Sequence, residues 1–306
     1  MKKDLLSIKD LKIEEIEHIF SLTDDLKAKV KDFSSALSEK CLGLIFLKPS
    51  LRTRVSFEAG MAHLGGSTFY LSPEDIKFGT REAVKDIGSV LSRYLNVLVI
   101  RTFSQKQLVE LAQFCAIPVI NGLTDLFHPC QALSDLYTIK EKKGNLKNAK
   151  ISFIGDGNNV VHSLLYGCAK LGINLNVATP KNHRPKDEIV KEAINIAQKK
   201  GADIYLSQDP REVAQEADVI YTDVWTSMGQ ESECKIRAKD FAGFQINQGL
   251  VSLAKKDCLI MHCLPAHRGE EIADDVIDGP NSIVFDQAEN RMHVQKAILL
   301  HLVGSF

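Results

Sequence analysis

The segment LGLIFLKPSLRTRVSFEAGMAHLGG, residues 42–66, holds the structural unit from which the rest of the chain is built. Its apolar run, residues 42–47, predicts a strand that is buried in a sheet. The spacing of Phe57, Met61 and Leu64 predicts a helix, and the two glycines that follow are typical of a helix end. A buried strand that leads directly into a helix is the repeating unit of a parallel α/β sheet.

The same alternation of apolar strands and amphipathic helices continues along the chain and predicts an α/β fold with two doubly wound parallel sheets. A length of 306 residues suits two domains. The polar, turn-like residues 143–148 predict the boundary between them. We therefore expect one domain of residues 1–144, a second of residues 145–286, and a C-terminal helix, residues 287–306, that returns to the first domain.

Composition and charge exclude several classes of protein. The formal net charge is −1 and the basic residues form no tail or stripe, so nucleic acids and anionic membranes are poor partners. The N-terminus lacks the apolar core of a signal peptide, and no apolar run approaches the roughly 18 residues that a membrane span needs. The seven cysteines are scattered without a CxxC pair, which indicates reduced thiols and a cytoplasmic location.

Four residues with polar side chains lie at the predicted N-terminus of the first of these helices, directly after the strand: Ser50, Arg52, Thr53 and Arg54. Backbone N–H groups, the helix dipole, two hydroxyls and two guanidinium groups would converge there, and such a place binds a dianion such as phosphate. An ordinary capped helix with solvated arginines is the other interpretation. The hydroxyl between two arginines favours the anion site.

Further polar residues follow other predicted strands. Arg101 ends one strand and His128 begins a helix after another; both could polarise an acyl oxygen, although each alone also suits a surface or capping role. Gln131 adds an amide that can donate and accept. Because ligands bind beyond the carboxyl ends of parallel strands, we expect these loops to form one site.

The stretch GDGNN, residues 155–159, also follows a strand and contains the first two glycines of a GxGxxG dinucleotide fingerprint. The third position is Val160, and the next strand lacks the acidic residue that would hold a ribose. A nicotinamide dehydrogenase is therefore a weak alternative. The two asparagines could bind a carboxylate at the helix N-terminus, or could simply cap the helix.

Three later segments offer groups for an amino-acid substrate or a further anion. Asp223 could pair with an ammonium group and Ser227 could make polar contacts, but a solvated loop would look the same. Cys263 follows another buried strand and could be a nucleophile, a metal ligand or a buried apolar residue. Arg291, near the start of the last helix, could be an anion donor or a surface charge.

Taken in order, the segments SLRTR (residues 50–54) and HPCQ (residues 128–131) resemble the carbamoyl phosphate signatures of the aspartate/ornithine carbamoyltransferase family. The segments SMG (residues 227–229), HCLP (residues 262–265) and ENR (residues 289–291) are similar to the ornithine branch. The aspartate branch lacks both SMG and HCLP. The resemblance covers essentially the whole chain.

The resemblance implies transfer of the carbamoyl group from carbamoyl phosphate to the δ-amine of L-ornithine, which gives L-citrulline and phosphate in arginine metabolism. It implies direct attack without a covalent intermediate, a homotrimer or a multiple of it, and neither cofactor nor metal. Two other interpretations stay open. One is a carbamoyltransferase for another amine, such as putrescine or an N-acylated ornithine, and the other is a non-catalytic paralogue that binds a ligand or a partner enzyme.

The resemblance also assigns site residues. Carbamoyl phosphate would be bound by Ser50, Leu51, Arg52, Thr53, Arg54, Arg101, His128, Gln131, Cys263, Leu264 and Arg291. Ornithine would be bound by Asn159, Asp223, Ser227 and Met228. The catalytic residues among these would be Arg52, Arg101, His128 and Cys263. Cys263 would orient the δ-amine rather than act as a nucleophile.

The chain departs from the family pattern at Leu51, where a threonine is usual. The change removes one hydroxyl donor but keeps the backbone N–H, so we expect phosphate binding to survive. Lys77, placed by its distance from the following glycine, is the candidate to reach the site of a neighbouring subunit.

Overall fold

The computed structural model of the chain describes all residues except 1–2, 77–80, 148, 228, 230 and 305–306. It divides into two compact units, one of residues 1–137 with 290–306 and the other of residues 138–289. Each unit is built on one parallel sheet with helices between its strands, which confirms the predicted fold class. Along the chain, the first unit ends and the second begins inside helix α6 (Pro129–Lys143). The predicted domain boundary lies at the carboxyl end of this helix. The domain limits therefore stay a prediction.

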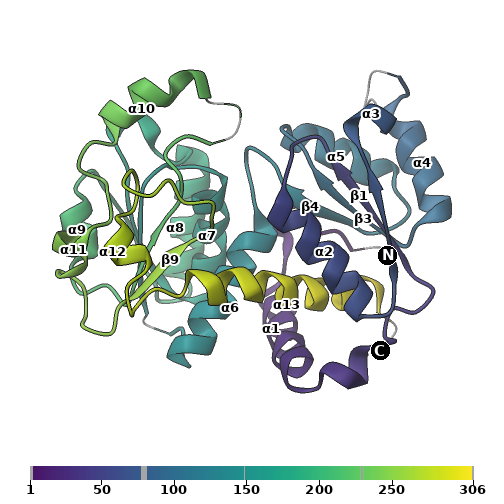
Figure 1. Ribbon diagram of the computed structural model, residues 1–306, viewed down its shortest axis with the longest axis horizontal. Coiled ribbons are helices and arrows are strands. Elements are labelled where there is room, and N and C mark those ends of the chain that lie inside the picture. Colours follow the sequence, from purple (N-terminus) through teal and green to yellow (C-terminus); the bar gives the residue numbers. More distant parts are fainter. Residues whose placement is uncertain (1–2, 77–80, 148, 228, 230, 305–306) are drawn as a thin grey trace. The chain divides into compact units, whose positions relative to one another are not determined.

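The first unit contains a four-stranded parallel sheet in the order β2-β1-β3-β4 (Figure 1). Its strands are β1 (Cys41–Phe46), β2 (Ser67–Leu71), β3 (Val97–Arg101) and β4 (Val119–Leu123). Strand β2 pairs with one edge of β1, and β3, the next strand in the sequence, pairs with the other edge. A topological switch point therefore lies between β1 and β3. Phe46 pairs with Arg101 there, and the segments that follow both strands leave the sheet together.

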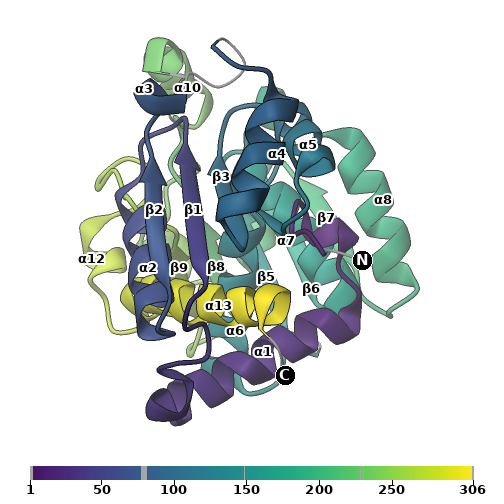
Figure 2. The same ribbon diagram turned by 90° about the vertical axis from the view of Figure 1, so that its right-hand side faces the viewer.

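Helices pack over this sheet, and the side chains of β3 are buried on both faces, as a helix-covered parallel sheet requires. The helices before α6 are α1 (Ile13–Ala28), α2 (Leu51–His63), α3 (Pro73–Ile76), α4 (Val84–Tyr94) and α5 (Gln105–Phe114). Helices α4 and α5 lie side by side over one face (Figure 2), where Ile87, Leu98 and Leu111 belong to one buried apolar cluster.

The C-terminal helix α13 (Val284–Val303) returns to the first unit, as expected. Asn290 accepts a hydrogen bond from the ammonium group of Lys27 in α1 at 2.7 Å. The helix begins at Val284, before the predicted start at residue 287, because the N–H of Gln287 closes a first helical turn on the carbonyl of Ile283.

The second unit contains a five-stranded parallel sheet in the order β7-β6-β5-β8-β9 (Figure 2). Its strands are β5 (Lys150–Ile154), β6 (Asn174–Ala178), β7 (Ile204–Ser207), β8 (Val219–Thr222) and β9 (Leu259–His262). The direction of winding reverses between β5 and β8, which makes this the second switch point. Thr222 pairs with His262, so the residues that follow these strands are neighbours.

The helices of the second unit are α7 (Asn159–Leu171), α8 (Asp187–Gln198), α9 (Pro210–Ala214), α10 (Cys234–Asp240), α11 (Gln248–Val251) and α12 (Asp274–Ile277). Helix α7 begins directly after the turn that follows β5, so its N-terminus lies at the switch point. Among the helices described here, none is long and apolar enough to cross a membrane.

Candidate active site

The N-terminus of α2 supplies the first part of the site. Ser50 has an extended backbone, with φ −163°, and its hydroxyl accepts the N–H of Thr53 at 3.2 Å, so it is the N-cap. The remaining N–H groups of the first turn have no partner within the helix and are available to an anion. The side chain of Leu51 is 74% exposed. Only the backbone of Leu51 is therefore in a position to contribute to the anion site.

Two guanidinium groups converge on the hydroxyl of Thr53, which is itself buried. Arg291, from α13, lies 2.7 Å from the Thr53 oxygen, and Arg101, at the end of β3, lies 3.4 Å from it. Within the described residues, Arg101 and Arg52 have no ion-pair partner, and the Nε of Arg101 has no hydrogen-bond partner. Buried cations without a counter-charge are costly, so this place calls for an anion.

The pKa of Arg101 shows how strongly positive this pocket is. Burial lowers the pKa of its guanidinium to about 10, and the charges of Arg291 and Arg52 add to the effect. Burial, with the charges of Arg291 and Arg101, also holds the pKa of His128 well below its usual value. His128 is therefore neutral at pH 7 and carries one N–H donor and one acceptor nitrogen.

Helix α6 fixes the orientation of the Gln131 amide. Its NH₂ group donates to the carboxylate of Asp135, one helical turn later, at 2.8 Å, and both side chains are buried. Because a carboxylate meets only the NH₂ end of an amide, the carbonyl end of Gln131 is left to accept a hydrogen bond from another N–H group. Nearby Cys130 is a structural thiol, since burial raises its pKa to about 12.

Arg54 is engaged elsewhere in the first unit. Its Nε lies 2.9 Å from a carboxylate oxygen of Glu58, and its guanidinium carbon lies 3.7 Å from the centre of the Tyr70 ring. A role for Arg54 in anion binding stays a prediction. Two other predicted site residues, Lys77 and Met228, lie outside the described residues.

The turn after β5 gives the second glycine of GDGNN a structural role. A Cβ at Gly157 would lie 2.3 Å from the backbone nitrogen of Pro185, and the N–H of Gly157 donates to the carbonyl of His183. This glycine is needed for close packing of two backbone segments. Asn158 caps α7 by accepting the N–H of Val160 at 2.9 Å, whereas Asn159, the predicted ligand, is the first residue of the helix.

Asp223 is the centre of the second unit's polar cluster, and it is nearly buried. One of its carboxylate oxygens accepts the thiol of Cys263 and the N–H of Val224, both at 2.8 Å. The other accepts the amide of Asn158 at 2.7 Å. The Cys263 thiol is thus a hydrogen-bond donor to a carboxylate, which suits an orienting group rather than a thiolate nucleophile.

The loop that contains Ser227 is held at its base by Arg237 of α10. The guanidinium group of Arg237 donates to the carbonyl of Trp225 and forms an ion pair of 2.6 Å with Asp156. Burial raises the pKa of Asp156 to about 6, although Arg237 and then His183 oppose the rise. Ser227 itself is half-buried.

Sequence reasoning missed three of these supporting residues: Asp135, Asp156 and Arg237. Asp156 lies inside the glycine-containing turn that was already singled out, and Asp135 lies one helical turn after Gln131, so spacing could have suggested both. Arg237 is distant in sequence from its partners, and no local signal identifies it.

Among the residues that the structure describes, two groups of side chains have ligand atoms close enough for a metal ion: Asp223, His262 and Cys263, and His267, Glu270 and Glu271. In the first group both ring nitrogens of His262 are already hydrogen-bonded, to Leu264 and to Glu271. A metal would have to displace one of these bonds.

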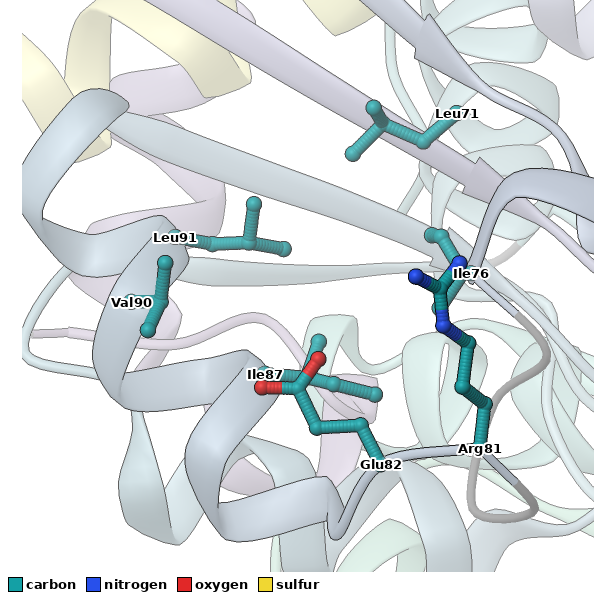
Figure 3. Close-up of a pocket in the computed structure, with 7 residues that line it drawn as sticks. All are labelled: Leu71, Ile76, Arg81, Glu82, Ile87, Val90 and Leu91. Atoms are coloured by element: carbon teal, nitrogen blue, oxygen red, sulfur yellow. The ribbon is translucent and has the colours of Figure 1, made fainter.

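A pocket of about 300 Å³ lies elsewhere in the first unit, beside α4 (Figure 3). It is lined by Leu71, Ile76, Arg81, Glu82, Ile87, Val90 and Leu91. Its lining is mostly apolar and includes none of the predicted site residues.

The neutral state of His128 predicts a pH dependence of stability. A histidine whose pKa is lowered by folding stabilises the folded state above its unfolded pKa, and this contribution is lost as the pH falls below about 6.5. Urea unfolding measures the free energy of unfolding of wild type and of His128→Gln. The difference between the two free energies should shrink by up to about 1.4 kcal/mol for each pH unit below about 6.5.

Asp156 changes stability in the opposite direction, since its raised pKa favours the folded state as the pH falls through about 6. Asp156 is present in both wild type and His128→Gln, so the difference between their free energies of unfolding reports the contribution of His128. A difference that stays constant between about pH 5 and pH 7 would contradict a neutral, buried His128.

Comparisons with known proteins identify the family. The family model described as "Aspartate/ornithine carbamoyltransferase, carbamoyl-P binding domain" matches residues 3–141, and the "Asp/Orn binding domain" model matches residues 147–302. A protein of Bacillus subtilis named ornithine carbamoyltransferase is 52% identical over 97% of this chain and 92% of its own length. One of Anoxybacillus flavithermus with the same name is 51% identical over 98% of this chain and 96% of its own length.

The solved structure of ornithine carbamoyltransferase from Pyrococcus furiosus matches with a TM-score of 0.97 and 48% identity, over 100% of this chain and 98% of that chain. The structure of the enzyme from Campylobacter jejuni, described as anabolic, matches with a TM-score of 0.93 and 38% identity, over 98% of both chains. This chain therefore belongs to the aspartate/ornithine carbamoyltransferase family.

Proposed function

We propose that this chain transfers the carbamoyl group from carbamoyl phosphate to the δ-amine of L-ornithine, giving L-citrulline and phosphate in arginine biosynthesis. The observation that carries the proposal is the pair of buried arginines, Arg101 and Arg291, that meet at the hydroxyl of Thr53 beside the N-terminus of α2. The relatives support it, because they are named ornithine carbamoyltransferase and the one from Pyrococcus furiosus is named anabolic.

In this proposal the phosphate occupies the N-terminus of α2, where Ser50, Arg52, Thr53 and Arg54 bind it, with Arg291 completing the pocket. The backbone N–H of Leu51 takes part and its side chain does not, in line with its exposure. The Thr53 oxygen accepts from two guanidinium groups, so its own proton is available to donate to the substrate.

The carbamoyl group is held by donors on its oxygen and acceptors on its nitrogen. Arg101 and the N–H of neutral His128 polarise the carbonyl oxygen. The free carbonyl end of Gln131 accepts from the NH₂ group, together with the backbone of Cys263 and Leu264. Oxygen and nitrogen are thereby distinguished by donor and acceptor chemistry alone.

Ornithine is held in the second unit. Asp223 offers the negative charge for its α-ammonium group, and Asn159, Ser227 and Met228 complete the contacts with the amino-acid end. Cys263, whose thiol is hydrogen-bonded to Asp223, orients the δ-amine.

The chemistry is a direct displacement. The lone pair of the neutral δ-amine attacks the carbamoyl carbon, and the carbonyl oxygen takes up negative charge that Arg101 and His128 stabilise. The bond from carbon to the phosphate oxygen then breaks, and phosphate leaves with a proton from the amine. The free amine has a pKa near ~10.4, by analogy with lysine, so a cationic site that lowers this value assists the attack.

The same family membership leads us to propose a cytoplasmic homotrimer, or a multiple of it. We further propose that residues 1–144, with the C-terminal helix 287–306, bind carbamoyl phosphate, and that residues 145–286 bind ornithine. Lys77 is the candidate to reach the neighbouring subunit's site. The solution mass of the purified protein tests the assembly.

An amine panel with carbamoyl phosphate tests the acceptor. Citrulline formation from L-ornithine should exceed carbamoylation of putrescine and N-acetylornithine by at least ~100-fold in kcat/KM, because neither alternative offers a free α-ammonium beside a carboxylate for the site to bind. A preference for putrescine would replace the proposed acceptor. Absence of turnover with every amine would favour a non-catalytic paralogue.

Arg52→Ala should lower kcat/KM for carbamoyl phosphate at least ~100-fold, in line with the loss of one charged donor to the substrate. Steady-state assays with each substrate varied in turn measure the effect. Arg93→Ala, which removes an exposed arginine from α4, is the matched control and should behave as wild type. Near-normal turnover in Arg52→Ala would remove Arg52 from the phosphate site.

Cys263→Ala should keep measurable citrulline formation, since the thiol orients the amine and forms no bond to carbon. Mass spectrometry of wild type quenched during turnover should find no carbamoyl-cysteine at this position. Cys234→Ala, at an exposed cysteine, controls for the general effect of removing a thiol. A carbamoyl adduct on Cys263 that forms and decays at the rate of turnover would contradict direct attack.

A further inference from the structure

The segment after β9 carries a hydrogen-bonded chain that none of the site residues above accounts for. We propose that His262 and Glu271 are positioning residues, which hold the backbone of Leu264 in the conformation that meets the carbamoyl group. This inference rests on the proposed function, because that function places Leu264 against the carbamoyl nitrogen.

Leu264 has an unusual backbone. Its φ is +56°, in the left-handed region that a residue with a Cβ adopts at an energetic cost. Within the described residues only Glu39 and Glu216 share this feature among residues other than glycine. Such a conformation persists where its surroundings enforce it, and it often marks a functional site.

The ring of His262 enforces this conformation. Its Nδ1 accepts the N–H of Leu264, two residues later, at 2.9 Å, and the ring is completely buried. Because Nδ1 accepts, the proton of the neutral ring is on Nε2, which donates to the carboxylate of Glu271 at 2.9 Å. Glu271 therefore selects the tautomer that leaves Nδ1 free to hold Leu264.

One oxygen of Glu271 accepts hydrogen bonds from two residues of the segment. Besides the His262 ring, this Oε1 accepts the backbone N–H of His267 at 2.6 Å. The side chain of Glu271 is fully buried, and its other oxygen has no hydrogen-bond partner among the described residues. A carboxylate buried in this way serves the two N–H groups that it accepts and is not a surface charge.

The neighbouring residues are held by other partners. The N–H of His262 donates to the side chain of Gln287 at 3.0 Å, and Cys263 donates to Asp223 at 2.8 Å. The His262 ring and Glu271 are therefore the side chains that act on the backbone of Leu264, while Asp223 acts on the thiol. Separate substitutions can therefore perturb the backbone of Leu264 and the thiol of Cys263.

A pair of variants separates the two ring nitrogens of His262. In His262→Asn, the side-chain oxygen takes the place of Nδ1 and can accept the N–H of Leu264. In His262→Gln, the amide reaches toward Glu271 but offers nothing at the position of Nδ1. We expect kcat to fall about 100-fold in His262→Gln and less than about 10-fold in His262→Asn, as for misplacement of one reacting group.

A second pair tests Glu271 in the same way. In Glu271→Gln, the amide oxygen can still accept both N–H groups, so activity should stay within about 10-fold of wild type. In Glu271→Leu, both acceptors are lost and kcat should fall as in His262→Gln. The KM for ornithine should change less than about 3-fold in all four variants, because Asp223 and Asn158 are left intact.

Thermal denaturation separates this role from a general structural one. Equal losses of kcat in both members of each pair, or losses that follow the melting temperatures, would overturn the proposal. Citrulline formation by wild type is the reference, so failure of the proposed function would be seen in wild type itself. Failure of this proposal would be seen in the variants alone.

A crystal structure of wild type with carbamoyl phosphate gives a test that depends on no variant. The carbonyl of Leu264 should face the carbamoyl nitrogen while its N–H remains on Nδ1 of His262. A Leu264 that has left the His262 ring in the complex would overturn the proposal.

Discussion

The positive charge buried around the hydroxyl of Thr53 is the constraint on which the first unit depends. Arg101 ends a strand and Arg291 comes from the C-terminal helix, and both donate to this one oxygen. Burying guanidinium groups together costs free energy, which an anion with two charges recovers. The return of α13 to the first unit is what brings Arg291 beside Thr53 and Arg101.

The second unit has the opposite charge at its switch point. Asp223 accepts from a thiol, an amide and a backbone N–H, and Glu271 accepts from a ring and a backbone N–H. One unit thus offers donors suited to a dianion, and the other offers Asp223, a carboxylate suited to an ammonium group.

Strand ends were the most predictable part of the site. The apolar run before Ser50 and the strand that ends at Arg101 are visible in the sequence, and parallel strands bring such ends to one edge. The supporting residues Asp135, Arg237 and Glu271 were missed. Asp135 lies one helical turn after Gln131, so spacing could have suggested it. A charged residue normally predicts an exposed position, and nothing local indicates that Arg237 and Glu271 are buried against their partners.

The sequence by itself determined the alternation of strands and helices, the position of the N-terminus of α2 and the family, because these depend on short-range patterns of apolar and polar residues. The tertiary structure alone decided which oxygens and nitrogens face one another. It showed that Asn158 caps the helix and pairs with Asp223, and that the His262 ring holds the backbone of Leu264. Such contacts depend on strand register and side-chain direction, which spacing along the chain does not specify.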